Sequence, residues 1–245
     1  MAFYDFYGYG KFPRYVPVAE RRAKALKQAR KLEKRGRVLE PVSLTGQRIA
    51  SSFWGKEWCK NLESYMDFSN RLARGRTYLR SGAVVDLRIG TGQIDALVAG
   101  SSLYEVSVRI GKLARKRWGA VTKRCAGHID SVVGLLQGRL SETVLEALVD
   151  RRTGLFPAPK EIDFTCSCPD FAFLCKHIAA VLYGVGARLD KKPELFFTLR
   201  SVALEELVTK SALRRAPPAK EELDAGSLEG IFGIELDRRP RRRVR

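Results

Sequence analysis

The sequence predicts an α+β fold, in which helices surround a small antiparallel sheet and a ββα-like zinc finger, between basic, extended termini. Three β-rich runs between Thr77 and Ile110, separated by turns that contain glycine, predict the sheet. Apolar residues at helical spacing before and after these runs predict the helices. Three cysteines and a histidine close together in the sequence predict the finger.

The N-terminal part, residues 1–47, is expected to be an aromatic and basic arm followed by a helix. Residues 1–17 hold aromatic rings among glycines, prolines and cations, and such rings stack on unpaired bases or pack against the domain or a partner protein. Residues 18–35 are rich in Ala, Lys, Arg and Leu, and Gly36 ends the predicted helix. Because its apolar side chains are mostly small, we expect this helix to face solvent or nucleic acid, outside the core.

Residues 48–150 are expected to form an α+β domain. One face of its first helix carries large apolar residues, which predicts core packing for Trp54, Trp58, Leu62 and Tyr65. The β-rich runs predict a three-stranded meander at residues 84–89, 94–98 and 104–110. Further helices are predicted at residues 111–124, 129–137 and 141–150, the last with Ser141 as its N-cap.

The remaining sequence divides at residue 210. Residues 151–210 hold the zinc segment and the short apolar helices that we expect to pack on it. Residues 211–245 contain a polar linker with a Pro-Pro pair, a short apolar clip at Ile231–Leu236 and an arginine-rich tail. The clip is expected to dock back on the domain or on a partner.

Composition favours a polyanionic partner. Lys and Arg total 45 against 27 Asp and Glu, a formal net charge of +18, which attracts DNA, RNA or an anionic membrane surface. No apolar run approaches the length of a membrane helix, so no membrane span is expected, and nucleic acid is predicted as the partner instead of a membrane. The aromatic, basic N-terminus does not have the composition of a signal peptide, and clustered cysteines favour metal binding in a reducing compartment. The predicted location is the cytoplasm.

The zinc segment has the ligand pattern C-x-C-x6-C-x-H, formed by Cys166, Cys168, Cys175 and His177. Zinc prefers thiolate and imidazole ligands at tetrahedral corners. The first two cysteines follow a β-like run, and the last two ligands lie where an apolar helix begins, so all four reach one ion. Because protein side chains fill all four coordination positions of the zinc ion, none is left for a reactive water. A structural zinc is therefore predicted.

The other possible metal ligands are Cys59, Cys125 and His128. Cys125 and His128 have C-x-x-H spacing, but a second zinc site would lack an evident fourth ligand. Cys59 follows the core face of Trp58, and Cys125 lies at a predicted helix end. A second metal site and an active-site thiol are therefore the disfavoured interpretations of these residues, and the sequence assigns them no role.

The segment CSCPDFAFLCKHIAAVLY resembles the SWIM zinc finger, which occurs in bacterial ATPase-associated proteins, plant transposases and MEK-kinase-like proteins. Together with FWGKEWCKNLE and RLARGRTYLRSGAVVDL, it resembles the bacterial SWIM-finger proteins over about residues 45–210. The four metal ligands match the motif without departure. The resemblance implies DNA binding or protein interaction, and a Swi/Snf-type helicase-like ATPase as partner.

Two basic runs without acidic residues are the candidate nucleic-acid contacts. Arginine forks match phosphate geometry and also stack on bases, although such runs are also typical of solvated surfaces. The first run surrounds Tyr78 and the second surrounds Trp118. The candidate residues are Arg71, Arg74, Arg76, Arg80, Lys112, Arg115, Lys116, Arg117, Lys123 and Arg124.

The sequence therefore predicts a non-catalytic zinc protein that binds nucleic acid, DNA in preference to RNA, and acts with a helicase-like ATPase. The alternative is an adaptor, or an RNA- or ribosome-associated protein, that docks through its basic arms. No phosphate-binding loop, nucleophile–base signature or complete dinucleotide motif is present, so neither catalysis nor a small-molecule substrate is expected.

Overall fold

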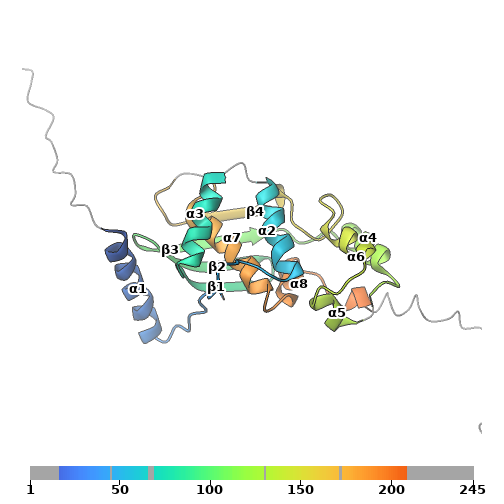
Figure 1. Ribbon diagram of the computed structural model, residues 1–245, viewed down its shortest axis with the longest axis horizontal. Coiled ribbons are helices and arrows are strands. Elements are labelled where there is room, and N and C mark those ends of the chain that lie inside the picture. Colours follow the sequence, from blue (N-terminus) through green and yellow to red (C-terminus); the bar gives the residue numbers. More distant parts are fainter. Residues whose placement is uncertain (1–16, 45, 66–68, 130, 171–172, 209–245) are drawn as a thin grey trace, which may run out of the picture.

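A four-stranded antiparallel sheet forms the centre of the computed structural model, which describes residues 17–44, 46–65, 69–129, 131–170 and 173–208 (Figure 1). The strands have the order β1-β2-β3-β4. Their bounds are Val84–Gly90 for β1, Gln93–Ala99 for β2, Leu103–Ile110 for β3 and Ile162–Cys166 for β4. The predicted meander is confirmed as β1 to β3. The β-like run before the zinc ligands adds the fourth strand, which pairs with β3.

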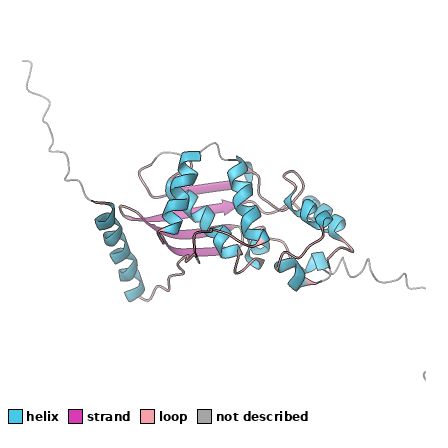
Figure 2. Ribbon diagram, viewed as in Figure 1, coloured by secondary structure: helices cyan, strands magenta, loops and turns pink. Residues whose placement is uncertain are grey.

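Helices cover one face of the sheet, as Figure 2 shows. They are α2 (Phe53–Tyr65), α3 (Ser69–Arg80), α7 (Lys176–Leu189) and the short α8 (Glu194–Leu199). Helix α7 is central and is buried on nearly all sides, as expected for a helix that is apolar around its whole circumference. Gly75 of α3 permits the close approach of α7, because a Cβ at this position would lie 2.5 Å from the Cβ of Ala179. The zinc-finger helix is therefore part of the main core.

The tryptophans of α2 lie in this core, as predicted. Trp54 and Trp58 are fully buried, and their ring N–H groups donate to the carbonyls of Leu135 at 3.0 Å and Leu182 at 2.8 Å. Leu62 is also fully buried. The side chain of Tyr65, the fourth residue of the predicted face, lies outside the described residues.

Helix α1 (Val18–Lys34) packs against the opposite face of the sheet. The prediction of a helix is confirmed, but the expectation that it lies outside any core is wrong. Ala25 and Ala29 are buried against strand residues that include Leu97 and Ala99. Strand residues alternate between faces, so these side chains point away from α7. Small alanine side chains allow the helix to lie close to the sheet and leave its long cationic side chains outside.

The helices after β3 lie at the other end of the molecule, to the right in Figure 1. They are α4 (Arg115–Cys125), α5 (Val132–Leu136) and α6 (Glu142–Val149), each shorter than predicted. Ser141 is the N-cap residue of α6, although its side chain makes no capping hydrogen bond. Lys112 and Leu113 precede α4. The N–H of Leu113 donates to the carbonyl of Arg200, so it does not take part in the hydrogen bonds of the helix.

A buried ionic group joins this end of the molecule to the sheet. The guanidinium of Arg200, which is fully buried, donates to Glu161 at 3.0 Å and to the carbonyl of Gly111 at 2.5 Å. Glu161 ends the short 3-10 helix η1 (Pro159–Glu161) and also accepts from Arg117 of α4 at 3.2 Å. The carboxylate of Glu161 thus holds together α4 and the segment that carries Arg200, which are distant in the sequence.

The four-part division of the chain remains a prediction. Its boundary at residue 150 lies between β3 and β4, two strands that pair with each other. The aromatic arm before Pro17, the Pro-Pro linker, the apolar clip and the arginine-rich tail lie outside the described residues.

Candidate metal centre and basic surfaces

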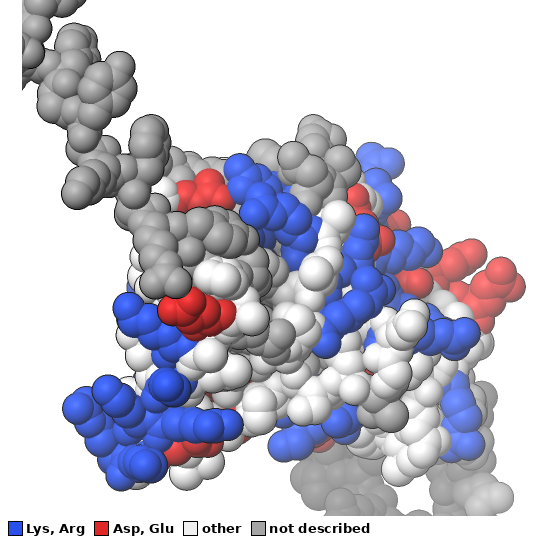
Figure 3. Space-filling model, turned by 60° about the vertical axis from the view of Figure 1, so that its left-hand side comes forward, with Lys and Arg blue, Asp and Glu red and all other residues white. Residues whose placement is uncertain are grey.

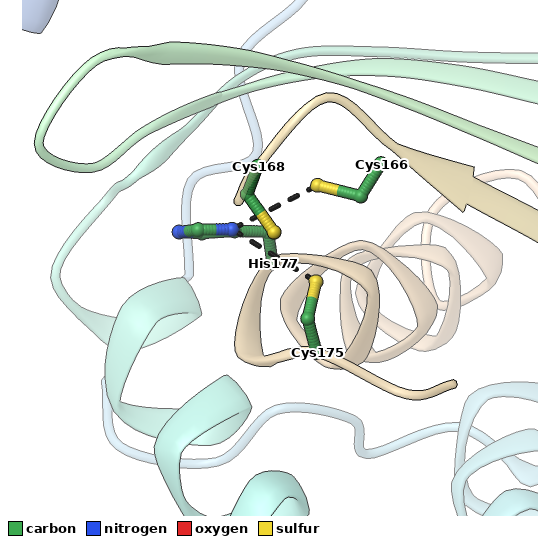
Figure 4. A group of neighbouring side chains, drawn as sticks. All are labelled: Cys166, Cys168, Cys175 and His177. Carbon is green, nitrogen blue, oxygen red and sulfur yellow. Dashed lines mark hydrogen bonds between the residues drawn. The ribbon is translucent and has the colours of Figure 1, made fainter. Parts of the chain in front are cut away.

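The four predicted ligands converge at the junction of β4 and α7 (Figure 4). Cys166 is the last residue of β4, where pairing with Val106 fixes its position, and Cys168 follows two residues later. Cys175 is the N-cap residue of α7, and its Sγ accepts the N–H of Ile178 at 3.5 Å. His177 lies in the first turn of the helix. All four ligand atoms lie within 4.8 Å of one another.

The geometry fits a tetrahedral zinc ion. Zinc–sulfur bonds of ~2.3 Å and zinc–nitrogen bonds of ~2.0 Å place neighbouring ligand atoms roughly 3.6 to 3.8 Å apart. The Nδ1 atom of His177 lies 3.8 Å from the Sγ of Cys166 and 3.9 Å from the Sγ of Cys175. Figure 4 shows this nitrogen facing the sulfur atoms, so Nδ1 is the ligand atom of the histidine.

The histidine ring is held by packing. His177 is 1% exposed, and its ring centroid lies 4.4 Å from that of Tyr104 and 5.3 Å from that of Tyr78. Its Nε2 atom is buried and has no hydrogen-bond partner among the described residues. A Cβ at Gly100 would lie 3.0 Å from this atom and 2.9 Å from the Tyr104 ring. Two rings and the absence of a side chain at Gly100 therefore fix the orientation of the ligand.

The sequence did not indicate these neighbours of the histidine. Tyr78 lies in a basic run of the sequence and Tyr104 at the start of a β-rich run. The spacing of the ligands contains no information about residues that reach the site from α3 and from the start of β3. Tertiary packing alone brings them to the metal site.

The thiols of Cys166 and Cys175 influence each other's protonation. The Cys166 thiol donates a hydrogen bond to Cys175, and this bond lowers the pKa of Cys175 to about 3. The same bond, together with burial, raises the pKa of Cys166. A zinc ion takes the place of such shared protons, because only thiolates coordinate it. Three thiolates and one imidazole complete the tetrahedron, so the site is structural.

The other cysteines form no second site. Burial raises the pKa of Cys59 to about 12 and that of Cys125 to about 11, so both remain neutral thiols at physiological pH. His128 is exposed. Within the described ranges, Cys166, Cys168, Cys175 and His177 are the one cluster of three or more potential ligands close enough to hold an ion.

Some of the predicted nucleic-acid contacts are occupied by structural ion pairs. Arg71 bonds to Asp170 at 2.7 Å, which ties α3 to the loop between the zinc ligands. Arg76 bonds to Glu63 at 2.8 Å. Arg117 has a side chain that is only 17% exposed, and it bonds to Glu161. Replacement of Arg117 is therefore expected to disturb the fold, which the sequence did not indicate.

The other predicted cations are exposed, and the described part of the chain gives none of them an ion pair. They are Arg74, Arg80, Lys112, Arg115, Lys116, Lys123 and Arg124. Figure 1 shows that α3 and α4 lie far apart along the molecule, so the two runs do not form one continuous surface. Trp118 is not an exposed stacking residue, because it is buried and its ring N–H bonds to Glu206 at 2.9 Å.

Helix α1 adds a basic surface that the list of predicted contacts left out. Its exposed cations form no ion pair with any described residue: Lys24, Lys27, Arg30, Lys31, Lys34 and Arg35. Figure 3 faces the end of the molecule that carries α1, and Lys and Arg cover more of this view than Asp and Glu do. The charge of the helix was visible in the sequence, but its docking was not.

None of the helices in the described ranges is long and apolar enough to span a membrane.

Comparisons with known proteins agree with the metal site. The family model of the SWIM zinc finger matches residues 159–185, which include all four ligands. The chain is 32% identical over 179 residues to Rv2102 of Mycobacterium tuberculosis, described as an uncharacterized protein. The match covers 72% of this chain and 64% of the relative. No solved structure matches the chain. The chain thus carries a zinc-binding SWIM finger with Cys166, Cys168, Cys175 and His177 as its ligands.

Proposed function

We propose that this chain is a non-catalytic nucleic-acid-binding protein in which zinc orders the fold and basic helices outside the finger contact phosphates. The docking of α1 carries the proposal. Its buried alanines hold the helix on the sheet, while Lys27, Lys31 and Lys34 remain exposed and without an ion pair among the described residues. A helix fixed in this way presents several cations at defined spacing to a phosphate backbone.

The finger itself has a structural role in this proposal. Lys160 and Lys176 are the cations of the matched segment, and Lys176 is half-buried with its ammonium 5.8 Å from the Tyr78 ring centroid. Loss of zinc would release the start of α7 and the end of β4, and α7 packs against α2, α3 and the sheet. Zinc therefore acts on binding through the fold.

The proposal extends to DNA in preference to RNA, and to a helicase-like ATPase as partner. The SWIM finger supports interaction with nucleic acid or protein in general. The preference for DNA and the ATPase partner rest on the resemblance to the bacterial SWIM-finger proteins. The matched family is a zinc finger over residues 159–185.

An adaptor function is the second candidate, and Phe173 favours it. This side chain is 68% exposed and its ring lies 4.7 Å from that of Phe164, beside the zinc ligands. This exposed ring offers apolar contact area to a partner protein. A pulldown from native lysate with Phe173→Ala as the control tests this candidate.

Mobility-shift assays over a series of salt concentrations test the main proposal with duplex DNA, single-stranded DNA and RNA. Each phosphate contact contributes about 0.9 to the slope of log K against log salt for duplex DNA. Substitution of Lys27, Lys31 and Lys34 by Ala is expected to reduce the slope by roughly 2 to 3. Arg139→Ala, an exposed residue at the other end of the molecule, is the control. Absence of binding at low salt, or binding that does not depend on salt, would contradict the proposal.

A further inference from the structure

A shallow cleft of about 270 Å³ opens between α2 and α3, away from the zinc site. Its walls come from residues 48–50, from both helices and from Tyr183 of α7. The cationic side chains that line it are Arg48, Lys56, Lys60, Arg76 and Arg80. We call it the α2–α3 cleft. Only Arg76 and Arg80 were among the predicted contacts, since the other three cations are dispersed in the sequence.

The one acidic residue of this lining, Glu63, is already bound. Its Oε1 accepts from the Nη1 of Arg76 at 2.8 Å and from the hydroxyl of Tyr183 at 2.7 Å. Arg76 also lies over the Tyr183 ring, 5.5 Å from its centroid. Glu63 therefore positions Arg76 and leaves the positive charge of the other cations uncompensated.

Arg48, Lys56, Lys60 and Arg80 all line this one cleft and are exposed. Arg80 donates through its Nε to the carbonyl of Gln47 at 3.1 Å, which ties the guanidinium to the segment that also carries Arg48. Arg48 and Lys56 form no ion pair within the described residues. Lys60 contacts Glu57 at 3.5 Å, an exposed pair that an anionic ligand displaces easily.

The floor of the cleft is neutral. Burial raises the pKa of Cys59 to about 12, and burial together with Glu63 raises the pKa of Tyr183. Both groups stay protonated at physiological pH and add no negative charge. The cleft is smaller than the ~300–1,000 Å³ typical of sites for larger ligands, which favours a small anion.

We propose that the α2–α3 cleft binds a phosphate group between the guanidinium groups of Arg48 and Arg80 and the ammonium groups of Lys56 and Lys60. Arginine forks and lysine ammonium groups are the side chains that proteins use for phosphate. The ligand is a backbone phosphate of nucleic acid or free inorganic phosphate, and only the first source rests on the proposed function.

Titration of the zinc-loaded full chain with inorganic phosphate, against chloride at equal ionic strength, tests the site. Backbone amide shifts are expected to concentrate in residues 46–60 and 76–80. The double variant Arg48→Ala/Arg80→Ala is expected to weaken phosphate binding at least about tenfold. Both side chains are exposed and the variant removes one exposed hydrogen bond, from Arg80 to the Gln47 carbonyl, so the melting temperature should change little. The control Arg139→Ala removes a charge elsewhere and should bind phosphate like the wild type.

A short oligonucleotide then separates the two sources. If it shifts the same amides and competes with phosphate, the ligand is the nucleic-acid backbone. If phosphate binds in the cleft but the oligonucleotide shifts only α1, the cleft is a site for free phosphate. Absence of phosphate-induced shifts in the cleft, or equal binding by the double variant, would overturn the inference even in a protein that binds DNA through α1.

Discussion

The contact between α3 and α7 depends on Gly75, and its replacement by alanine measures how tightly the finger helix is packed. An added Cβ would lie 2.5 Å from the Cβ of Ala179, 2.8 Å from the carbonyl carbon of the same residue and 2.9 Å from the N atom of Ala180. Two of these atoms belong to the backbone of α7, so the helix itself must move. Overpacking of a core costs typically about 1–3 kcal/mol, and a backbone clash places Gly75→Ala at the upper end.

The intrinsic helix propensity of alanine offsets about 1 kcal/mol of this cost. We therefore expect Gly75→Ala to lower the free energy of unfolding by about 2 kcal/mol, which shifts the melting temperature by roughly 4–8 °C in a chain of this size. Ala179 follows His177 by two residues, so displacement of α7 should also speed zinc loss to a chelator.

The matched control is Gly119→Ala in α4, where an added Cβ would meet no atom within 4 Å. This substitution should instead stabilise the protein, by up to about 1 kcal/mol. Urea denaturation of the zinc-loaded proteins measures both values. Stability of Gly75→Ala equal to that of Gly119→Ala would refute the close packing of α3 on α7.

Three further outcomes are expected. Cys166→Ser should lose the zinc that elemental analysis detects in the wild type, whereas Cys125→Ala should retain one equivalent; retention by Cys166→Ser would contradict the ligand set. Burial alone would raise the pKa of Asp190, but hydrogen bonds from two serines at the start of α2 lower it below the ordinary 3.8. The ionised group thus stabilises the fold above pH 3.8, and this contribution is lost as the pH falls through the lower pKa of the folded state. The free energy of unfolding of Asp190→Asn should therefore depend less on pH between pH 5 and 3 than that of the wild type. Glu161→Gln removes the carboxylate that bonds both Arg200 and Arg117 and should cost about 3–5 kcal/mol in urea denaturation, whereas a loss below about 1 kcal/mol would show that these pairs contribute little.

Local sequence patterns predicted the parts of the fold that short-range geometry controls. The spacing of the zinc ligands limits them to one strand end and one helix start, so the metal site followed from the segment itself. The helical period of Trp54, Trp58 and Leu62 indicated a buried face, and all three residues are fully buried. Alternation and glycine turns were enough to predict the three-stranded meander.

The same patterns did not show where helices and strands meet. Helix α1 was interpreted as solvated because its apolar side chains are small, yet small side chains are what a close helix–sheet contact requires. The pairing of β4 with β3 joins residues more than fifty positions apart, and no local pattern specifies such a partner.

By itself the sequence determined the zinc ligands, the composition of the core and the excess of positive charge. Only the tertiary structure decided which cations are available to a ligand, because the acids that bind the occupied arginines come from other elements: Asp170 binds Arg71 and Glu161 binds Arg117. It also decided the ligand atom of His177, since Tyr78 and Tyr104 reach the ring from other elements. Spacing along the chain fixes neighbours within a turn or a strand, whereas ion pairs and ring contacts between distant segments depend on how the whole core packs.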